Sequence, residues 1–230
     1  MSIQRAFACL RPDPIFTRRL VETKTIVRDR VGSQLYLDHP PHLTLYLSSF
    51  PCLEDVRREL ASLAEEIATP RVEVVGWHVF SADPLTGGVT LVCRMDDEGV
   101  KLLRTIQKRI VERLSPLRHP ATARDRFAAN RAALSDAEWA SVEKWGFPYV
   151  GGGWIPHFTV ASVKARVWGS VWDAVGKGPL LGSVKCPEIV LCSLDDGYPV
   201  EVDSFSLRGR SYPEMPVQRS GRFVQTASTG

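Results

Sequence analysis

Hydrophobic and polar side chains alternate along two short segments, residues 42–47 and 154–161, and a period of two predicts half-buried β-strands. Compact apolar runs bounded by turn residues predict further strands at residues 3–10, 72–80, 89–94, 184–193 and 200–207. The last two runs flank the turn sequence Asp195-Asp196-Gly197-Tyr198, which indicates a β-hairpin.

Between these strands, apolar residues recur every three or four positions, which is the spacing of an amphipathic helix. The pattern is clearest in residues 53–68 and 97–114, and it also predicts helices in residues 14–30, 136–146 and 167–175. Ser135 and Glu138 have the spacing of a capping box, so we expect a helix to begin there.

The two halves of the chain repeat one order of elements. Each half has a proline, then His-x-Thr on a strand, then a helix, then two strands. Two copies at so long a period indicate a two-fold internal duplication, because a solenoid repeats a shorter unit more often.

The composition is that of a soluble globular protein, with 44% hydrophobic and 24% charged residues among 230. This length is enough for one large domain or two small lobes with a sizeable core. The formal net charge is only +3 and the sequence pI is about 8.6. Bulk DNA binding normally needs a concentrated basic stripe, so the charge instead suits a small anionic ligand.

The five cysteines show no C-x-x-C spacing, and no secretory signal precedes them. An odd number of cysteines in this context favours a reducing compartment, so we expect a cytoplasmic protein. Four cysteines lie in apolar stretches and are predicted to be small buried hydrophobes: Cys9, Cys93, Cys186 and Cys192. No apolar run approaches the roughly 18 residues of a membrane span, and we expect no membrane partner.

Candidate chemistry is concentrated in the two alternating segments. His42 and Thr44 are two residues apart, as are His157 and Thr159, so each pair projects from one face of its strand. Two imidazoles can serve as general base and general acid in a displacement at phosphorus, and the threonine hydroxyls can donate to the non-bridging oxygens. No H-x-H, H-x-x-x-H or carboxylate cluster appears, so we expect no dedicated metal site.

The segments Pro41-His42-Leu43-Thr44-Leu45 and Pro156-His157-Phe158-Thr159-Val160 resemble the paired motifs of the 2H phosphoesterase superfamily. That group includes bacterial 2′-5′ RNA ligase-like proteins and 2′,3′-cyclic phosphodiesterases. The resemblance covers residues 3–207 and implies an α+β fold with two pseudo-symmetric lobes of antiparallel sheet, outer helices and an active-site groove between the lobes. It also implies two-histidine acid/base catalysis of phosphodiester cleavage without metal or cofactor.

This resemblance sets the domain expectations as well. Residues 1–210 should form a single two-lobed domain with an insert at about residues 115–153. Residues 211–230 are polar and contain Pro, Ser and Thr, so we expect a disordered tail. We expect a monomer whose partner is a nucleotide or an RNA end.

Aromatic residues near the motifs are candidates for stacking on a nucleobase. Tyr36, Tyr46, Tyr149 and Trp154 are nearest in sequence, and packing in the core is the alternative for each. Simple alternation places Tyr46 on the face of His42 and Trp154 on the face opposite His157 unless Pro156 interrupts it. Arg11 could bind a phosphate, although it is more simply interpreted as an exposed arginine in a loop.

Three functions are compatible with these residues. The first is a phosphodiesterase that acts on a 2′,3′-cyclic phosphate or a 2′-5′ linkage, and the second is a nucleotide-binding or sensing module with little turnover. The third is a hydrolase of a cyclic oligonucleotide signal or a nucleotide-sugar-type metabolite. In that case the insert would form a lid that determines which substrate is bound. Arg124, Arg126 and Arg131 of the insert fit contact with an anionic ligand or, more simply, a solvated helical face.

Overall fold

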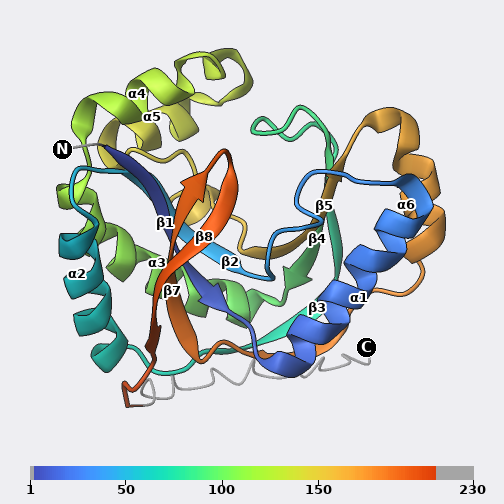
Figure 1. Ribbon diagram of the computed structural model, residues 1–230, viewed down its shortest axis with the longest axis horizontal. Helices are drawn as coiled ribbons and strands as arrows, with labels where there is room; N and C mark the ends of the chain where they lie inside the picture. The colour runs from blue at the N-terminus through green and yellow to red at the C-terminus, as the bar shows by residue number, and fades with distance from the viewer. Residues whose placement is uncertain (1–2, 211–230) are drawn as a thin grey trace, which may run out of the picture.

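The computed structural model describes residues 3–210 and contains two four-stranded antiparallel sheets (Figure 1). The first sheet has the order β2-β1-β7-β8 and the second has the order β5-β4-β3-β6. The strands of the first sheet are β1 (Gln4–Arg11), β2 (Leu43–Phe50), β7 (Glu188–Asp195) and β8 (Tyr198–Ser206). Those of the second are β3 (Arg71–Phe80), β4 (Val89–Met95), β5 (His157–Val163) and β6 (Gly182–Lys185).

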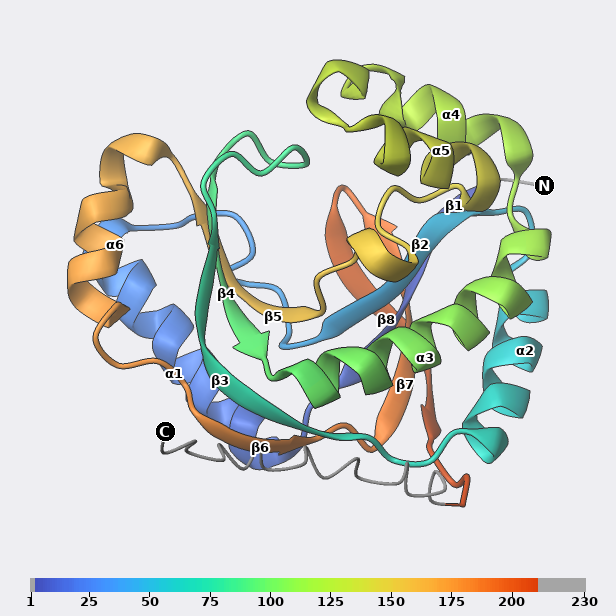
Figure 2. The same ribbon diagram turned by 180° about the vertical axis from the view of Figure 1, so that it is seen from behind.

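Helices cover one side of each sheet. The longer ones are α1 (Pro14–Val31), α2 (Leu53–Glu66), α3 (Asp97–Leu114), α4 (Pro120–Ala128), α5 (Asp136–Trp145) and α6 (Trp168–Val175). α1 packs on α6 and β5, whereas α2 packs on β7 and β8, so each sheet has its own outer helices (Figure 2). α3 contacts both β2 and β3 and therefore joins the two sheets. This architecture confirms the expected fold class.

Local sequence explains where the helices begin. Asp13 caps α1, because its Oδ1 accepts hydrogen bonds at 3.0 Å from the backbone N–H groups of Ile15 and Phe16. Ser135 and Glu138 form the predicted capping box at the start of α5. The four cysteines predicted to be buried are buried.

The two sheets do not correspond to the two halves of the sequence. β1 and β2 pair into a sheet with the C-terminal strands β7 and β8, while β3 and β4 pair with β5 and β6. One predicted strand, residues 184–193, is in fact two. Pro187 interrupts it, so that β6 pairs with β3 and β7 pairs with β1. The two halves that the sequence predicts to be a duplication are therefore interleaved in space.

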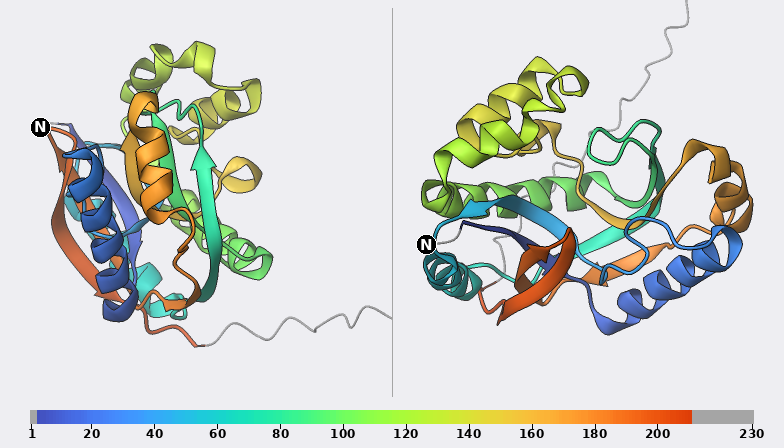
Figure 3. Two further views of the ribbon diagram at one scale, coloured as in Figure 1. Left: turned by 90° about the vertical axis from the view of Figure 1, so that its right-hand side faces the viewer. Right: turned by 45° about the horizontal axis from the view of Figure 1, so that its top comes forward.

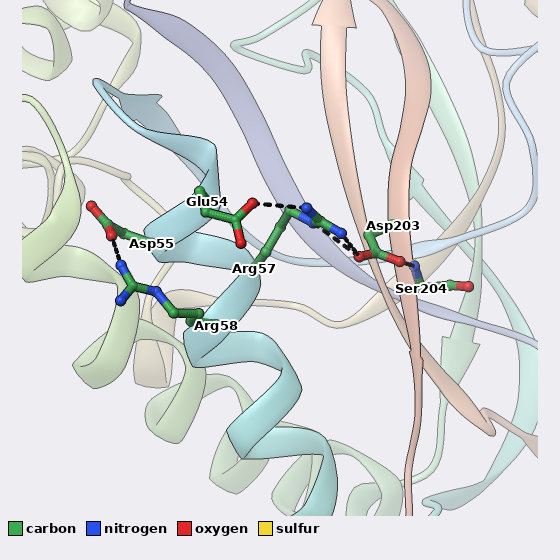
Figure 4. A network of polar contacts seen from close by, with 6 residues as sticks. All are labelled: Glu54, Asp55, Arg57, Arg58, Asp203 and Ser204. Atoms are coloured by element: carbon green, nitrogen blue, oxygen red, sulfur yellow. Dashed lines mark hydrogen bonds and ion pairs between the residues drawn. The ribbon is translucent and has the colours of Figure 1, made fainter.

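Arg57 of α2 links the helix layer to the sheet it covers. Its Nε and Nη2 donate to Asp203 Oδ2 of β8 at 2.9 and 2.7 Å, and its Nη1 donates to Glu54 at 2.8 Å (Figure 4). Asp203 also accepts a hydrogen bond from the Ser204 N–H, and Arg58 pairs with Asp55 on the neighbouring turn of the helix. This network fixes α2 against the edge strand of the first sheet.

The main apolar core fills the space between the sheets and their helices. The insert contributes to it through Phe127, Leu134 and Val142, so residues 115–153 are packed onto the rest of the domain. A smaller apolar cluster lies on the opposite face of the first sheet: Phe7, Cys9, Val190 and Cys192, with Leu47 and Leu194 packed against it. That opposite face is the one that carries His42.

The expected tail, residues 211–230, lies outside the described residues.

No helix in residues 3–210 is both long enough and apolar enough to cross a bilayer.

Candidate active site

The two His-x-Thr segments lie close together because each belongs to the edge of its sheet. β2 ends the first sheet, β5 ends the second, and the two strands contact each other. His42 directly precedes β2, and His157 is the first residue of β5. Burial lowers the pKa of His42 to about 4, and the nearby charge of His157 contributes to that shift. The contact between β2 and β5 therefore brings the two motifs into one region of the molecule.

Both imidazoles are oriented by the same local contact. His42 Nδ1 lies 2.7 Å from the Pro40 carbonyl oxygen, and His157 Nδ1 lies 2.7 Å from the Ile155 carbonyl oxygen. A carbonyl oxygen can only accept, so each Nδ1 carries the proton in the neutral ring. The free lone pair is then on Nε2 of both rings. A phenylalanine packs beside each one, with centroids of Phe7 and His42 at 5.1 Å and of Phe80 and His157 at 5.4 Å.

Each motif contains a β-bulge directly after its threonine. In β2, Cys9 pairs with Thr44 while Ala8 pairs with Tyr46, so Leu45 is an extra residue. In β5, Val92 pairs with Thr159 while Leu91 pairs with Ala161, so Val160 is the extra residue. The bulges reverse the alternation of side chains beyond the threonines. The four residues that precede the bulges, His42, Thr44, His157 and Thr159, are half-buried.

The threonine hydroxyls remain available to a ligand. Neither Thr44 nor Thr159 makes a side-chain hydrogen bond to any residue between 3 and 210. Hydroxyls that are half-buried and unused by the protein can donate to a bound anion. The four motif residues thus offer two Nε2 atoms and two hydroxyl groups.

The surroundings of the two histidines differ in charge. After burial, Lys24 is the largest nearby charge that lowers the pKa of His42, and His39 adds to its effect. Burial also lowers the pKa of His157, but there the carboxylate of Asp83 acts in the opposite direction. Asp83 lies in the turn between β3 and β4, where it accepts hydrogen bonds from Leu85 N–H and from Thr90 Oγ1 at 2.9 and 2.7 Å. Apart from burial, the charges of Lys24 and His39 disfavour the protonated form of His42, whereas the charge of Asp83 favours the protonated form of His157.

Lys24 was not predicted from the sequence, although it lies on the buried stripe of α1 with Leu20 and Val27. Its side chain is only 4% exposed, and Nζ donates to the carbonyl oxygens of Tyr36 and His39, both at 2.7 Å. Burial lowers its pKa to about 8. These contacts hold the loop before His42, whose Pro40 carbonyl orients the imidazole. The sequence feature that could have identified Lys24 is the presence of a lysine on the apolar stripe of an amphipathic helix.

Gln107 of α3 is a second buried residue that sequence reasoning missed. Its Nε2 donates to the carbonyl oxygens of Leu45 and Tyr149 at 3.1 and 2.8 Å, and its Oε1 accepts from Gly151 N–H at 3.0 Å. Leu45 is the bulge residue of the first motif, and residues 149–151 lead into the second. One fully buried amide therefore ties both motifs to the same helix.

Two of the aromatic candidates lie near the site. Tyr36 and Tyr149 are half-buried, and burial raises the pKa of both phenols, that of Tyr36 to about 12. The charge of Asp83 adds to the upward shift of both pKa values. Tyr36 also makes an edge contact with His39, at 5.1 Å between ring centroids.

The other candidates are placed differently. Tyr46 is fully buried in the core, and its hydroxyl donates to the Trp145 carbonyl; the bulge at Leu45 turned it away from the face of His42. Trp154 is 4% exposed and also packs in the core, as alternation indicated. Arg11 pairs with Glu188 at 2.9 Å and with Glu201, so its guanidinium is already neutralised.

Within residues 3–210, no three His, Cys, Asp or Glu side chains gather as a metal site.

Comparisons with known proteins agree with this fold. TT0787 of Thermus thermophilus has a similar fold, with a TM-score of 0.51 and 23% identity over 90% of this chain and 100% of that one. E. coli LigT complexed with NADP+ follows at a TM-score of 0.47 and 16% identity, covering 90% and 99% of the two chains. No curated protein sequence matches. The model of the 2′-5′ RNA ligase superfamily matches residues 12–197, a span that contains both motifs, and the chain belongs to that superfamily.

Proposed function

We propose that the protein is a metal-independent phosphodiesterase that cleaves a 2′,3′-cyclic phosphate or a 2′-5′ linkage in a nucleotide or RNA end. Membership of the superfamily supports a phosphodiesterase-type activity. The observation that carries the finer proposal is the matched orientation of two imidazoles. In both rings Nδ1 donates to the carbonyl two residues earlier, and the two histidines stand at the starts of contacting edge strands.

The unequal surroundings support distinct roles for the two histidines. A general base must be unprotonated, and Lys24 and His39 favour the neutral form of His42. A general acid must be protonated, and Asp83 favours the charged form of His157. For a cyclic phosphate, His42 Nε2 removes a proton from water as the oxygen attacks phosphorus. His157 donates its Nε2 proton to the departing ribose oxygen as the P–O bond breaks, and Thr44 and Thr159 donate to the non-bridging oxygens.

These roles predict an acidic pH optimum. We expect kcat/KM to rise through an acid limb near pH 4, where His42 loses its proton at a pKa of about 4. The pKa of His157 lies below its ordinary 6.5, so the alkaline limb should fall below pH 6.5 as the acid loses its proton. The pH profile of kcat/KM for the free enzyme measures both limbs.

The variant Asp83→Asn separates the two limbs. It removes the charge that raises the pKa of His157, so the alkaline limb should move to lower pH while the acid limb stays in place. Asp29→Asn, on the exposed side of α1, is the matched control and should move neither limb. An alkaline limb that does not respond to Asp83→Asn contradicts the assignment of His157 as the acid.

Turnover of a substrate panel tests the proposed function itself. The panel contains 2′,3′-cyclic nucleotides, 2′-5′-linked and 3′-5′-linked dinucleotides and a cyclic oligonucleotide, each assayed with and without a metal chelator. We expect hydrolysis of a cyclic phosphate or a 2′-5′ linkage that the chelator does not reduce. Calorimetric binding of the same compounds without any turnover would instead support the nucleotide-binding module, and cleavage of the cyclic oligonucleotide alone would support the signal hydrolase.

A further inference from the structure

The face of the second sheet that carries His157 holds further side chains that the proposed mechanism does not use. Cys93 and Phe158 point into the main core, so the residues on either side of them point to the opposite face. On that face the strand register aligns three rows of residues across β3, β4 and β5: Gly76, Arg94 and His157; His78, Val92 and Thr159; Phe80, Thr90 and Ser162. Arg94 is therefore the direct cross-strand neighbour of His157.

Ring contacts confirm which residues share this face. The ring centroids of Phe80 and His157 are 5.4 Å apart, and those of His78 and Phe80 are 4.6 Å apart. Helices α1 and α6 lie together on the outer side of the sheet (Figure 3), where α1 packs against Phe158. These two helices therefore leave the His157 face uncovered, and Arg94 is exposed on it.

The guanidinium of Arg94 is not used by the protein. It forms no ion pair and no side-chain hydrogen bond with any residue between 3 and 210. The three rows contain no Asp or Glu, and both carboxylate oxygens of Asp83 already accept hydrogen bonds from Leu85 N–H and the Thr90 hydroxyl. Directly opposed residues of an antiparallel pair have Cβ atoms roughly 5 Å apart, so these free donors start close to His157.

Open space lies on the other side of Arg94. Its neighbour on β3 is Gly76, which follows a β-bulge and has a φ of 156°, a conformation that favours glycine. No heavy atom beyond its chain neighbours lies within 4 Å of the position that a Cβ would take there. A planar group can therefore approach the Arg94 guanidinium from this side without meeting another side chain of the row.

The direction of the proposed displacement determines which part of the substrate lies over this face. Water attacks phosphorus from the side of His42, and His157 protonates the ribose oxygen that departs on the opposite side. The ribose and the base attached to it therefore lie on the side of His157, where the second sheet presents Arg94.

The donors of Arg94 suit one base in particular. An arginine offers only hydrogen-bond donors, arranged in a planar fork, so it pairs best with two adjacent acceptors. Guanine presents O6 and N7 side by side. On the corresponding edge adenine and cytosine present an amino donor, which repels the fork, and uracil has O4 without a second acceptor.

We infer that Arg94 binds O6 and N7 of guanine, so that guanosine 2′,3′-cyclic phosphate is preferred over the other three nucleoside cyclic phosphates. The inference rests on the proposed function, because the assignment of His157 as the acid places the base over β3 and β4. Phe80 lies on the same face beside the His157 ring and supplies an apolar surface for the base. Arg94 is thus a specificity-determining residue that takes no part in proton transfer.

The four nucleoside 2′,3′-cyclic phosphates test the inference. We expect kcat/KM for the guanosine compound to exceed that for the adenosine compound about tenfold, the discrimination of a bidentate arginine–guanine pair. In Arg94→Gln this ratio should fall toward one. Arg94→Lys should lose most of it as well, because lysine keeps the charge but not the fork. Arg166→Gln, an exposed arginine just before α6, is the matched control and should keep the full ratio.

A cyclic phosphate of 7-deazaguanosine, which lacks only the N7 acceptor, sharpens the test. The wild type should cleave it more slowly than the guanosine compound, whereas Arg94→Gln should cleave the two at equal rates. The inference is overturned by equal kcat/KM for all four bases in the wild type. A guanosine preference that persists in Arg94→Gln overturns it too, because another group must then bind the base.

Calorimetry separates this inference from the proposed function. If no cyclic phosphate is turned over, the proposed function fails, and binding of guanosine 3′-phosphate and adenosine 3′-phosphate then tests the base site alone. Tighter binding of the guanosine compound that Arg94→Gln abolishes would support the base site. Equal affinities in the wild type, or a difference that the substitution leaves in place, would refute it.

Discussion

Replacing His42 or His157 by alanine should lower kcat by about 10²- to 10⁴-fold each, because each variant removes one of the two proposed proton transfers. KM should change little, since the Thr44 and Thr159 hydroxyls, which we propose bind the phosphate oxygens, remain. The measurement is steady-state kinetics on the best substrate of the panel. His119→Gln is the matched control, because His119 lies outside the site at the start of α4, and it should keep full activity.

The double variant gives a sharper test of concerted action. If base and acid act in one displacement, His42→Ala with His157→Ala should lose little more activity than either single variant. Multiplicative losses would mean that the two imidazoles act in separate steps. Full activity in either single variant would remove the paired-histidine mechanism altogether. Circular dichroism spectra establish that each variant is folded before these outcomes are compared.

Replacing Gln107 by leucine should lower the free energy of unfolding by about 3 kcal/mol, because it leaves several buried backbone groups without partners. The groups are the carbonyl oxygens of Leu45 and Tyr149 and the N–H of Gly151. The same change should reduce kcat, since it loosens the bulge after Thr44 and the segment that leads to His157. Urea denaturation measures the first effect and kinetics at saturating substrate measures the second.

Gln34→Leu is the comparison for Gln107→Leu. Gln34 is half-buried and makes one side-chain hydrogen bond, from Nε2 to the Val31 carbonyl at 3.1 Å, so its loss should cost about 1 kcal/mol or less. Equal losses in the two variants would show that Gln107 has no special structural role. A stability loss at Gln107 without any change in kcat would show that it stabilises the fold but does not position the motifs.

Local sequence was sufficient to nominate the residues for the proposed chemistry. Alternation around His42 and His157 placed both threonines on the faces of their histidines, and the periodicity of residues 53–68 and 97–114 predicted α2 and α3. These features depend on neighbours within a few positions, which a sequence displays directly. The capping box at Ser135 has the same origin.

Contacts between distant segments decided the rest. The bulge at Leu45 sends Tyr46 into the core, and a bulge is defined by the register with β1 rather than by β2 alone. No neighbour in sequence pairs with Arg11, and only β7 and β8 bring Glu188 and Glu201 beside it. The interleaving of strands from both halves has the same cause, because strand pairing is a choice among partners far apart in the chain.

By itself, then, the amino-acid sequence nominated the residues for the proposed chemistry and predicted most of the strands and helices, but it missed helix α4 and the break between β6 and β7. The tertiary structure alone decided that the two histidines stand at the starts of contacting edge strands and that Lys24 and Asp83 give them unequal surroundings. The physical reason is range: side-chain alternation and helical periodicity act over a few residues, whereas burial and charge depend on every segment that packs nearby.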